Sequence, residues 1–127
     1  MSLRPLSPSA WHRLAAWAFW LYLAVVLLLT LSPVSYLQPV SAFTFWDKAE
    51  HGLAFAALAG LALLVWPARP LLLLLILLVF GGAIEQIQAA TGWRSGEWAD
   101  WLADGIGLAS GFLLWCAARR FLPTGLR

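Results

Sequence analysis

Long apolar segments alternate with short polar connections along this chain. Four apolar segments stand out, at approximately residues 14–31, 48–66, 71–90 and 98–118. Each is close to the ~20 residues that a helix needs to cross the hydrocarbon core of a bilayer. The apolar positions are continuous rather than alternating, which argues against the strands of a membrane barrel. Because backbone polar groups cannot stay unpaired in lipid, the pattern predicts four transmembrane helices.

The first apolar segment has some features of a signal peptide, because Arg4 and Arg13 precede it. However, the 18 residues from 14 to 31 exceed the ~7–15 apolar residues of a signal peptide. The nearest candidate cleavage sequence, Val40-Ser41-Ala42, lies well downstream of the apolar run. We therefore expect this segment to be retained as a transmembrane helix.

Composition supports a membrane location. Of the 127 residues, 62% are hydrophobic and 11% are charged, whereas soluble domains average about 25% charged residues. A soluble domain of this length buries too little of its surface to hide so much apolar area. Residues 1–127 therefore fit one all-α integral membrane domain, a four-helix bundle. A single cysteine, Cys116, supports neither a disulfide framework nor a thiolate metal site.

The charged residues are strongly polarised between the two sides of the predicted bundle. One side holds six basic residues and no acidic ones: Arg4, Arg13, Arg69, Arg119, Arg120 and Arg127. The other side holds Lys48, Arg94 and all six acidic residues, which gives it a net charge of −4. By the positive-inside rule, both termini are expected in the cytoplasm. The basic residues form no continuous stripe, so we expect no nucleic-acid partner.

Ionisable residues gather near the outer ends of three predicted helices. Asp47, Glu50 and His51 have spacings i, i+3 and i+4, which place them on one helix face. Glu85 and Gln88 are three residues apart on the third helix. On the fourth helix, Asp100 and Asp104 are four residues apart. The three sets are expected at a similar depth in the membrane.

Charges at this depth are costly, which predicts that they converge. An uncompensated charge costs about 2.5–3.5 kcal/mol at the bilayer centre and less toward the interface. Glu85 and Asp104 should therefore face the bundle interior, with Arg94 as the expected counter-charge and Lys48 as a second. The arrangement that lowers this cost most is one polar pocket, formed by His51, Glu85, Arg94, Asp100 and Asp104.

Three interpretations of this pocket remain open at the level of sequence. It is a structural network that fixes helix register, or a binding site in which Arg94 grips an anionic headgroup. Alternatively it is catalytic, with His51, Glu85 and Asp104 as acid and base. A divalent metal held by His51, Glu85 and one aspartate is a further alternative. The spacing matches no known ligand motif, so neither metal nor cofactor is assigned.

Small residues predict close helix packing. Gly107 and Gly111 form a GxxxG pair, and Gly52, Ala56 and Gly60 recur at four-residue spacing. Such faces let two helix backbones approach closely. The sequence does not decide whether they pack within one chain or between copies in a homo-oligomer.

The order of the polar residues resembles the VanZ-like family of small bacterial membrane proteins. The matching elements run over roughly half the chain: Asp47-Lys48-x-x-His51, Gly81, Glu85-x-x-Gln88, Gly92-x-Arg94-Ser95, Asp100, Asp104, Gly107 and Gly111. Two positions depart from the family pattern. Asp104 stands where many members have asparagine, which makes the pocket more acidic, and Trp93 stands where a small residue or proline is common.

The resemblance implies a multi-pass protein of the bacterial cytoplasmic membrane. Founding members are associated with resistance to the glycopeptide teicoplanin. We expect a cell-envelope protein whose outward-facing pocket binds an anionic amphiphile or a lipid-linked headgroup. The predicted ligand-binding residues are Asp47, Lys48, His51, Glu85, Gln88, Arg94, Ser95, Asp100 and Asp104. The alternative is a membrane-embedded hydrolase or transferase acting on a lipid-linked substrate.

Overall fold

The structure is a computed structural model, and it describes residues 7–33, 44–92 and 96–122, without the side chains of residues 44–47. Four long helices account for most of these residues: α1 (Pro8–Leu31), α2 (Thr44–Val65), α3 (Pro70–Thr91) and α4 (Trp98–Ala118). A short 3-10 helix, η2 (Arg119–Phe121), follows α4. The described residues contain no strand, so the all-α prediction is confirmed.

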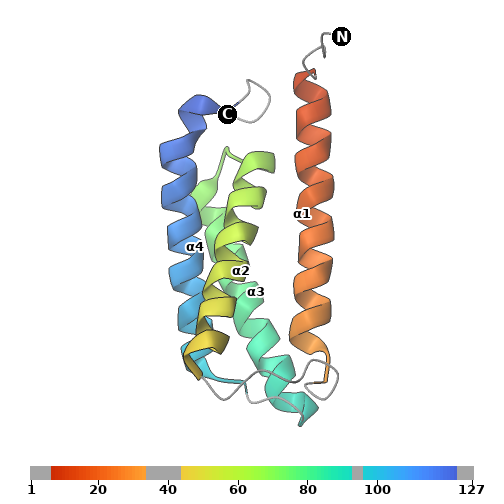
Figure 1. Ribbon diagram of the computed structural model, residues 1–127, viewed down its shortest axis with the longest axis vertical. Coiled ribbons are helices and arrows are strands. Elements are labelled where there is room, and N and C mark those ends of the chain that lie inside the picture. The colour runs from red at the N-terminus through yellow and green to blue at the C-terminus, as the bar shows by residue number, and fades with distance from the viewer. Residues whose placement is uncertain (1–6, 34–43, 93–95, 123–127) are drawn as a thin grey trace.

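All four helices are long and apolar enough to cross a membrane, so the chain is a multi-pass membrane protein. In Figure 1, α2 lies between α1 and α4, and α3 lies behind α2. The start of α1, the α2–α3 connection and the end of α4 lie at one end of the bundle, called here the terminal end. The opposite end, where α1 and α3 finish and α2 and α4 begin, is called the polar end.

Helix α1 is longer than predicted at its N-terminus. It begins at Pro8 rather than near residue 14, because Ser7 caps it by accepting a hydrogen bond from the Ala10 N–H. Proline is favoured at the first helical position, where its missing N–H costs nothing. Because several of the residues that follow Pro8 are polar, the hydrophobic pattern did not predict this first part of the helix. Helix α2 also starts earlier than predicted, at Thr44, whereas α4 has the predicted bounds.

Helix α3 ends at a glycine with a left-handed backbone. Gly92 has a φ of 77° at the position that caps the helix. Residues with a Cβ rarely adopt this backbone conformation, so glycine ends the helix with the least conformational strain. The chain can then turn toward the start of α4.

Helices α2 and α4 form the tightest packing in the bundle. A Cβ added at Gly107 would overlap the Gly52 carbonyl oxygen, and one at Gly111 would overlap that of Ala56. The two small-residue faces predicted from the sequence therefore meet each other within the chain. By contrast, a Cβ at Gly60 would meet no atom within 4 Å.

Helix α1 packs along α2 through aromatic and polar contacts. The rings of Phe19 and Trp66 meet edge to face at 5.1 Å. The Tyr22 hydroxyl donates to the Ala54 carbonyl at 3.3 Å, and His12 Nε2 lies 3.1 Å from the Val65 carbonyl oxygen. Each polar group therefore links α1 to the backbone of α2, which satisfies it within the apolar surroundings.

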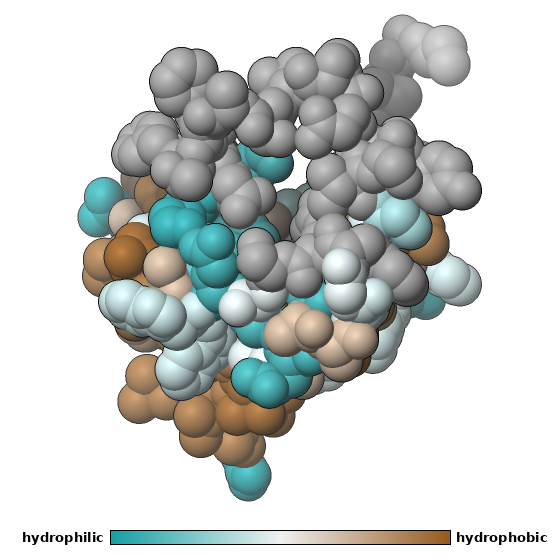
Figure 2. Space-filling model, turned by 90° about the horizontal axis from the view of Figure 1, so that it is seen from below, coloured by the Kyte–Doolittle hydropathy of each residue, from teal (hydrophilic) through white to brown (hydrophobic). Residues whose placement is uncertain are grey.

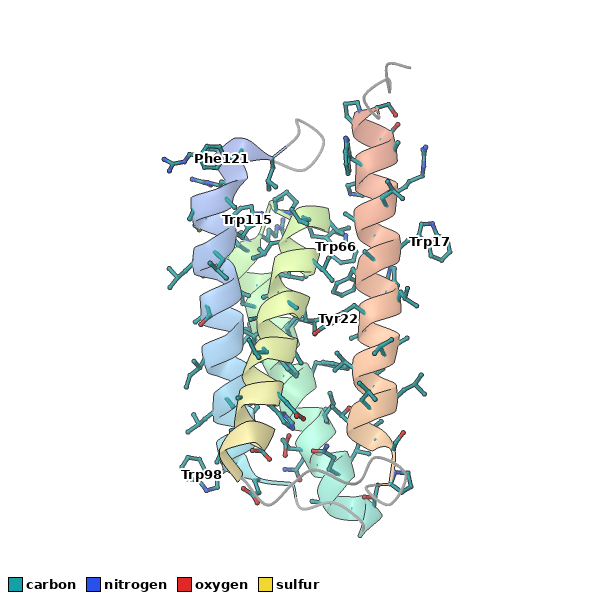
Figure 3. The ribbon with its side chains drawn as sticks, in the orientation of Figure 1. Trp17, Tyr22, Trp66, Trp98, Trp115 and Phe121 are labelled. Atoms are coloured by element: carbon teal, nitrogen blue, oxygen red, sulfur yellow. The ribbon has the colours of Figure 1, made fainter. Side chains whose placement is uncertain are left out.

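The described tryptophans are divided between the outside and the inside of the bundle. Figure 3 shows Trp17 and Trp98 projecting outward near opposite ends of the molecule, as membrane-interface anchors do. Trp115, by contrast, is buried with only 8% of its surface exposed. It stacks on Phe112 at 6.2 Å, and Arg119 lies over its ring.

Candidate functional site

The polar end gathers the ionisable residues of α2, α3 and α4. Hydrophilic side chains lie in the middle of this face and hydrophobic ones at its left and lower edges (Figure 2). Five polar residues here are buried, namely His51, Glu85, Gln88, Asp100 and Asp104. All five were predicted from the sequence as site residues. Helix periodicity explains the shared burial of Glu85 with Gln88 and of Asp100 with Asp104. Glu50, which the spacing grouped with His51, is exposed.

Three of these residues meet directly, and we call them the buried triad. His51 Nδ1 lies 3.0 Å from Asp104 Oδ1 and 3.8 Å from Glu85 Oε1. Each residue comes from a different helix, and none exposes more than 8% of its surface. The triad thus joins α2, α3 and α4 in an environment of low dielectric constant, where charge interactions are strong.

Two oxygens of the triad have no hydrogen-bond donor. Among the described residues, Glu85 Oε1 and Asp104 Oδ2 are buried without a partner. A buried acceptor without a donor costs about 1–3 kcal/mol, and more when it is charged. A network that only held the helices together would be expected to satisfy these atoms. The triad therefore has the capacity to accept a proton, a cation or a hydrogen-bond donor.

The other oxygen of Glu85 is held by the start of α4. Glu85 Oε2 accepts a hydrogen bond from the Glu97 backbone N–H at 2.9 Å. Gly96 permits this approach, because a Cβ there would overlap the Glu85 carbonyl oxygen. The free N–H groups at a helix N-terminus favour a nearby carboxylate. The glycine and the helix start thus orient Glu85 toward His51.

A second glycine makes room for Asp104. A Cβ at Gly81 would come within 2.7 Å of Asp104 Oδ2 and 3.1 Å of the Phe55 ring. Gly81 itself is buried on α3. Because Gly81 has no side chain, α3 leaves the space that the Asp104 carboxylate occupies beside the Glu85 carboxylate.

Lys48 forms a separate ionic cluster at the rim of the site. Its Nζ lies 3.0 Å from Glu97 Oε2 and 3.0 Å from Asp100 Oδ1. The side chain of Asp100 is 5% exposed, whereas those of Lys48 and Glu97 are 33% and 47% exposed. The sequence predicted Asp100 within the histidine pocket, but its hydrogen-bond partner is Lys48. The lysine therefore offsets rim carboxylates and makes no ion pair with the buried triad.

Gln88 serves helix packing in this structure. Its Nε2 donates to the Thr30 carbonyl at 2.8 Å, which ties α3 to the end of α1. Gln88 is only 3% exposed. Ligand binding by Gln88 stays a prediction, and in the structure its amide nitrogen donates to this backbone carbonyl.

The remaining predicted site residues cannot be placed. Arg94 and Ser95, and the side chain of Asp47, lie outside the described residues. The role of Arg94 as counter-charge and anion clamp therefore stays a prediction from the sequence.

Three residues of the site were not predicted from the sequence. Glu97 contributes both its carboxylate to Lys48 and its N–H to Glu85. Gly96 allows the close approach of the loop, and Trp101 Nε1 donates to the Leu78 carbonyl at 2.9 Å. A glycine followed by an acidic residue just before an apolar run was the one available signal, since acidic residues favour helix N-termini.

A cavity of about 560 Å³ lies away from this site, at the terminal end. Its lining is Pro67, Ala68, Trp115, Arg119 and Arg120. No histidine or acidic group is among the described residues of this lining. The chemistry of the described residues is concentrated at the polar end.

The buried triad resembles several reactive arrangements in its composition. A carboxylate hydrogen-bonded to a histidine orients the ring and can support proton transfer. Two carboxylates and an imidazole are also suitable ligands for a divalent cation. Comparison with protein families, with characterised proteins and with solved structures finds no match to this sequence.

Proposed function

We propose that this chain is a VanZ-like protein of the bacterial cytoplasmic membrane that binds the polar headgroup of an anionic amphiphile at its polar end. The observation that carries the proposal is the depth of the site. Glu85 precedes the end of α3 by six residues and Asp104 follows the start of α4 by six, about 9 Å of helix in each case. Because a helix of about 20 residues spans the hydrocarbon core, in this proposal the triad lies within one leaflet, where a headgroup that enters the polar end can reach it.

Both signs of charge are available to such a headgroup. Lys48 is partly exposed at the rim, where a headgroup anion would share it with Glu97 and Asp100. Arg94, by the sequence, lies in the connection between α3 and α4. A lysine and an arginine suit a phosphate or carboxylate. The carboxylates of the buried triad lie on the neighbouring helices and suit hydroxyl or ammonium donors. An amphiphile with both kinds of group, such as a phosphorylated polyol lipid, fits this combination.

The polar end faces away from the cytoplasm in this proposal. Six arginines belong to the terminal end and its flanking segments, and the positive-inside rule assigns that end to the cytoplasm. A fluorescent protein fused after Arg127 should then fold and fluoresce, whereas alkaline phosphatase fused there should be inactive. Active phosphatase at this position would contradict the orientation.

Lipid binding can be tested by native mass spectrometry of the purified protein mixed with bacterial lipids. We expect a specific lipid adduct that is lost in Arg94→Ala and reduced in Lys48→Met. Glu50→Gln is the matched control, because Glu50 is a charged residue in the same turn of α2 that is exposed and forms no ion pair with the described residues. Equal adducts in all variants would mean non-specific lipid and would contradict the proposal.

Glycopeptide susceptibility follows as a narrower expectation. If the ligand is an envelope precursor or a lipoglycopeptide, expression in a susceptible bacterium should raise the inhibitory concentration of teicoplanin. The increase should disappear with Arg94→Ala. An increase that survives this change would mean that the headgroup site is not responsible.

A second candidate function is catalysis on a lipid-linked substrate, favoured by the 3.0 Å contact between His51 and the buried Asp104. In this reaction His51 transfers the proton, Asp104 orients its ring, and Glu85 is the second carboxylate. Phosphorus NMR of a lipid-linked substrate incubated with the protein would detect turnover. Asp104→Asn should abolish turnover while lipid binding persists, and unchanged turnover would exclude this role.

A further inference from the structure

We propose that the buried triad is a binding site for a divalent transition-metal ion such as Zn²⁺, with His51 Nδ1 and one carboxylate oxygen each from Glu85 and Asp104 as ligands. One ligand atom of each residue lies within 4.8 Å of the other two. No part of this proposal requires a lipid, so it stands or fails separately from the headgroup proposal.

The distances suit a metal ion. With ligand bonds of about 2.0–2.2 Å, the ligand atoms of a tetrahedral zinc site lie about 3.3–3.6 Å apart. The distances from His51 Nδ1 to the two carboxylates, 3.0 and 3.8 Å, lie on either side of this range. Adjustment of side chains by roughly half an ångström would bring these two distances into the range. The two carboxylate oxygens lie within 4.8 Å of each other, so this third distance would shorten by up to about 1.5 Å when the ion binds.

The charges also suit a divalent ion. When both carboxylates are ionised, Glu85 and Asp104 carry two negative charges, and a neutral histidine adds none. A single proton on the histidine would leave the triad with a net charge of −1 in an apolar setting, whereas one divalent cation makes it neutral. Buried charge is expensive unless it is paired, so neutrality favours the ion. Lys48, one helical turn before His51 on α2, is already paired with Asp100 and Glu97.

Two unpartnered oxygens point independently to a ligand: Glu85 Oε1, a proposed ligand atom, and Asp104 Oδ2, the oxygen of Asp104 that does not contact His51. Glu85 Oε1 and Asp104 Oδ2 are buried and lack a donor within the described parts of the chain. Their residues are 5% and 1% exposed. Glu85 is moreover fixed by the Glu97 N–H through its other oxygen, in the manner of the outer hydrogen bonds that orient metal ligands. Three protein ligands would leave a fourth position for water or another oxygen ligand.

Zinc binding can be measured directly on protein without an affinity tag. The chain has only two histidines, so His12→Ala is a matched control for His51→Ala. After dialysis against Zn²⁺ in detergent, elemental analysis should find one zinc per chain in the unchanged protein and in His12→Ala. Loss of an outer hydrogen bond alone weakens metal sites about 10–100-fold, so loss of a ligand in His51→Ala should weaken binding by more than about 100-fold.

Two further measurements distinguish loss of the metal site from failure of a variant to fold. Co²⁺ in place of Zn²⁺ should give the visible absorption of a low-coordinate nitrogen–oxygen site in the unchanged protein. Zn²⁺ should also raise its melting temperature, since a ligand that binds only the folded state stabilises it. Asp104→Asn, which keeps the side-chain shape, should lose most of both effects.

The outcomes separate the two proposals. No zinc in the unchanged protein, or equal zinc in His51→Ala, would overturn the metal site whatever lipid is bound. Zinc binding that is lost when a triad residue is replaced would support the metal site even if no lipid adduct is found. A lipid adduct without zinc would support the headgroup proposal alone and overturn this one.

Discussion

The contact between Gly107 on α4 and the backbone of α2 gives the sharpest prediction about the fold. A methyl group at Gly107 would overlap the carbonyl oxygen of Gly52 and crowd its backbone carbons. Because the obstacle is backbone rather than a flexible side chain, the two helices must separate. We therefore expect Gly107→Ala to destabilise the bundle.

The magnitude follows from two opposing contributions. Replacing glycine by alanine within a helix gains about 0.8–1 kcal/mol of helix propensity. Overpacking a close contact costs about 1–3 kcal/mol, and a rigid backbone obstacle places this case in the upper half of that range. Gly107→Ala should therefore lower the free energy of unfolding by about 1–2 kcal/mol, the difference between these figures.

Gly105→Ala is the matched control on the same helix. A Cβ there would meet only Leu78 Cδ1 at 3.5 Å, an ordinary contact. This variant keeps the propensity gain without the overlap, so it should be at least as stable as the unchanged chain. The two variants should differ by about 2–3 kcal/mol, or roughly 30- to 150-fold in the unfolding equilibrium constant.

The assay is unfolding by increasing SDS in mixed micelles, followed by circular dichroism and tryptophan fluorescence. A Gly107→Ala variant as stable as Gly105→Ala would refute the reasoning, because α2 and α4 could not then be packed backbone to backbone in this register.

Three other predictions concern the polar end. Gln88→Leu removes the hydrogen bond to the α1 backbone and should cost about 0.5–1.5 kcal/mol in the same unfolding assay, and no loss would mean that α1 is not docked there. Lys48→Met should destabilise the protein by leaving Asp100 unpaired, and adding Asp100→Asn should restore part of the loss; absence of any rescue would argue against this ion pair. Gly81→Ala would place a Cβ 2.7 Å from Asp104 Oδ2 and should weaken zinc binding measured by dialysis, whereas unchanged affinity would place the carboxylate elsewhere.

The burial of the site residues was predictable, whereas their pairing was not. Helical spacing turned Asp100 and Asp104 to the same face of α4, and both are buried. Yet Asp104 meets His51 while Asp100 meets Lys48. The rotation and axial position of α4 relative to α2 decide this pairing, and no spacing within one helix contains that information.

Loop contributions were the least predictable. Glu97 joins the site through its backbone N–H as well as its carboxylate. A backbone donor has no signature in the side-chain sequence. Only the fold shows that Gly96 lies against α3 closely enough to bring this N–H to Glu85.

The sequence by itself determined that the chain crosses a membrane with four helices, because continuous apolar segments in lipid have few alternatives to the helix. It also determined that the acidic residues and His51 collect at one end, since their positions along each helix fix their depth. The tertiary structure alone decided that His51, Glu85 and Asp104 meet while Gln88 reaches toward α1. The physical reason is that depth is a property of one helix, whereas contact depends on how backbones approach, here through Gly52 against Gly107 and Gly81 beside Asp104.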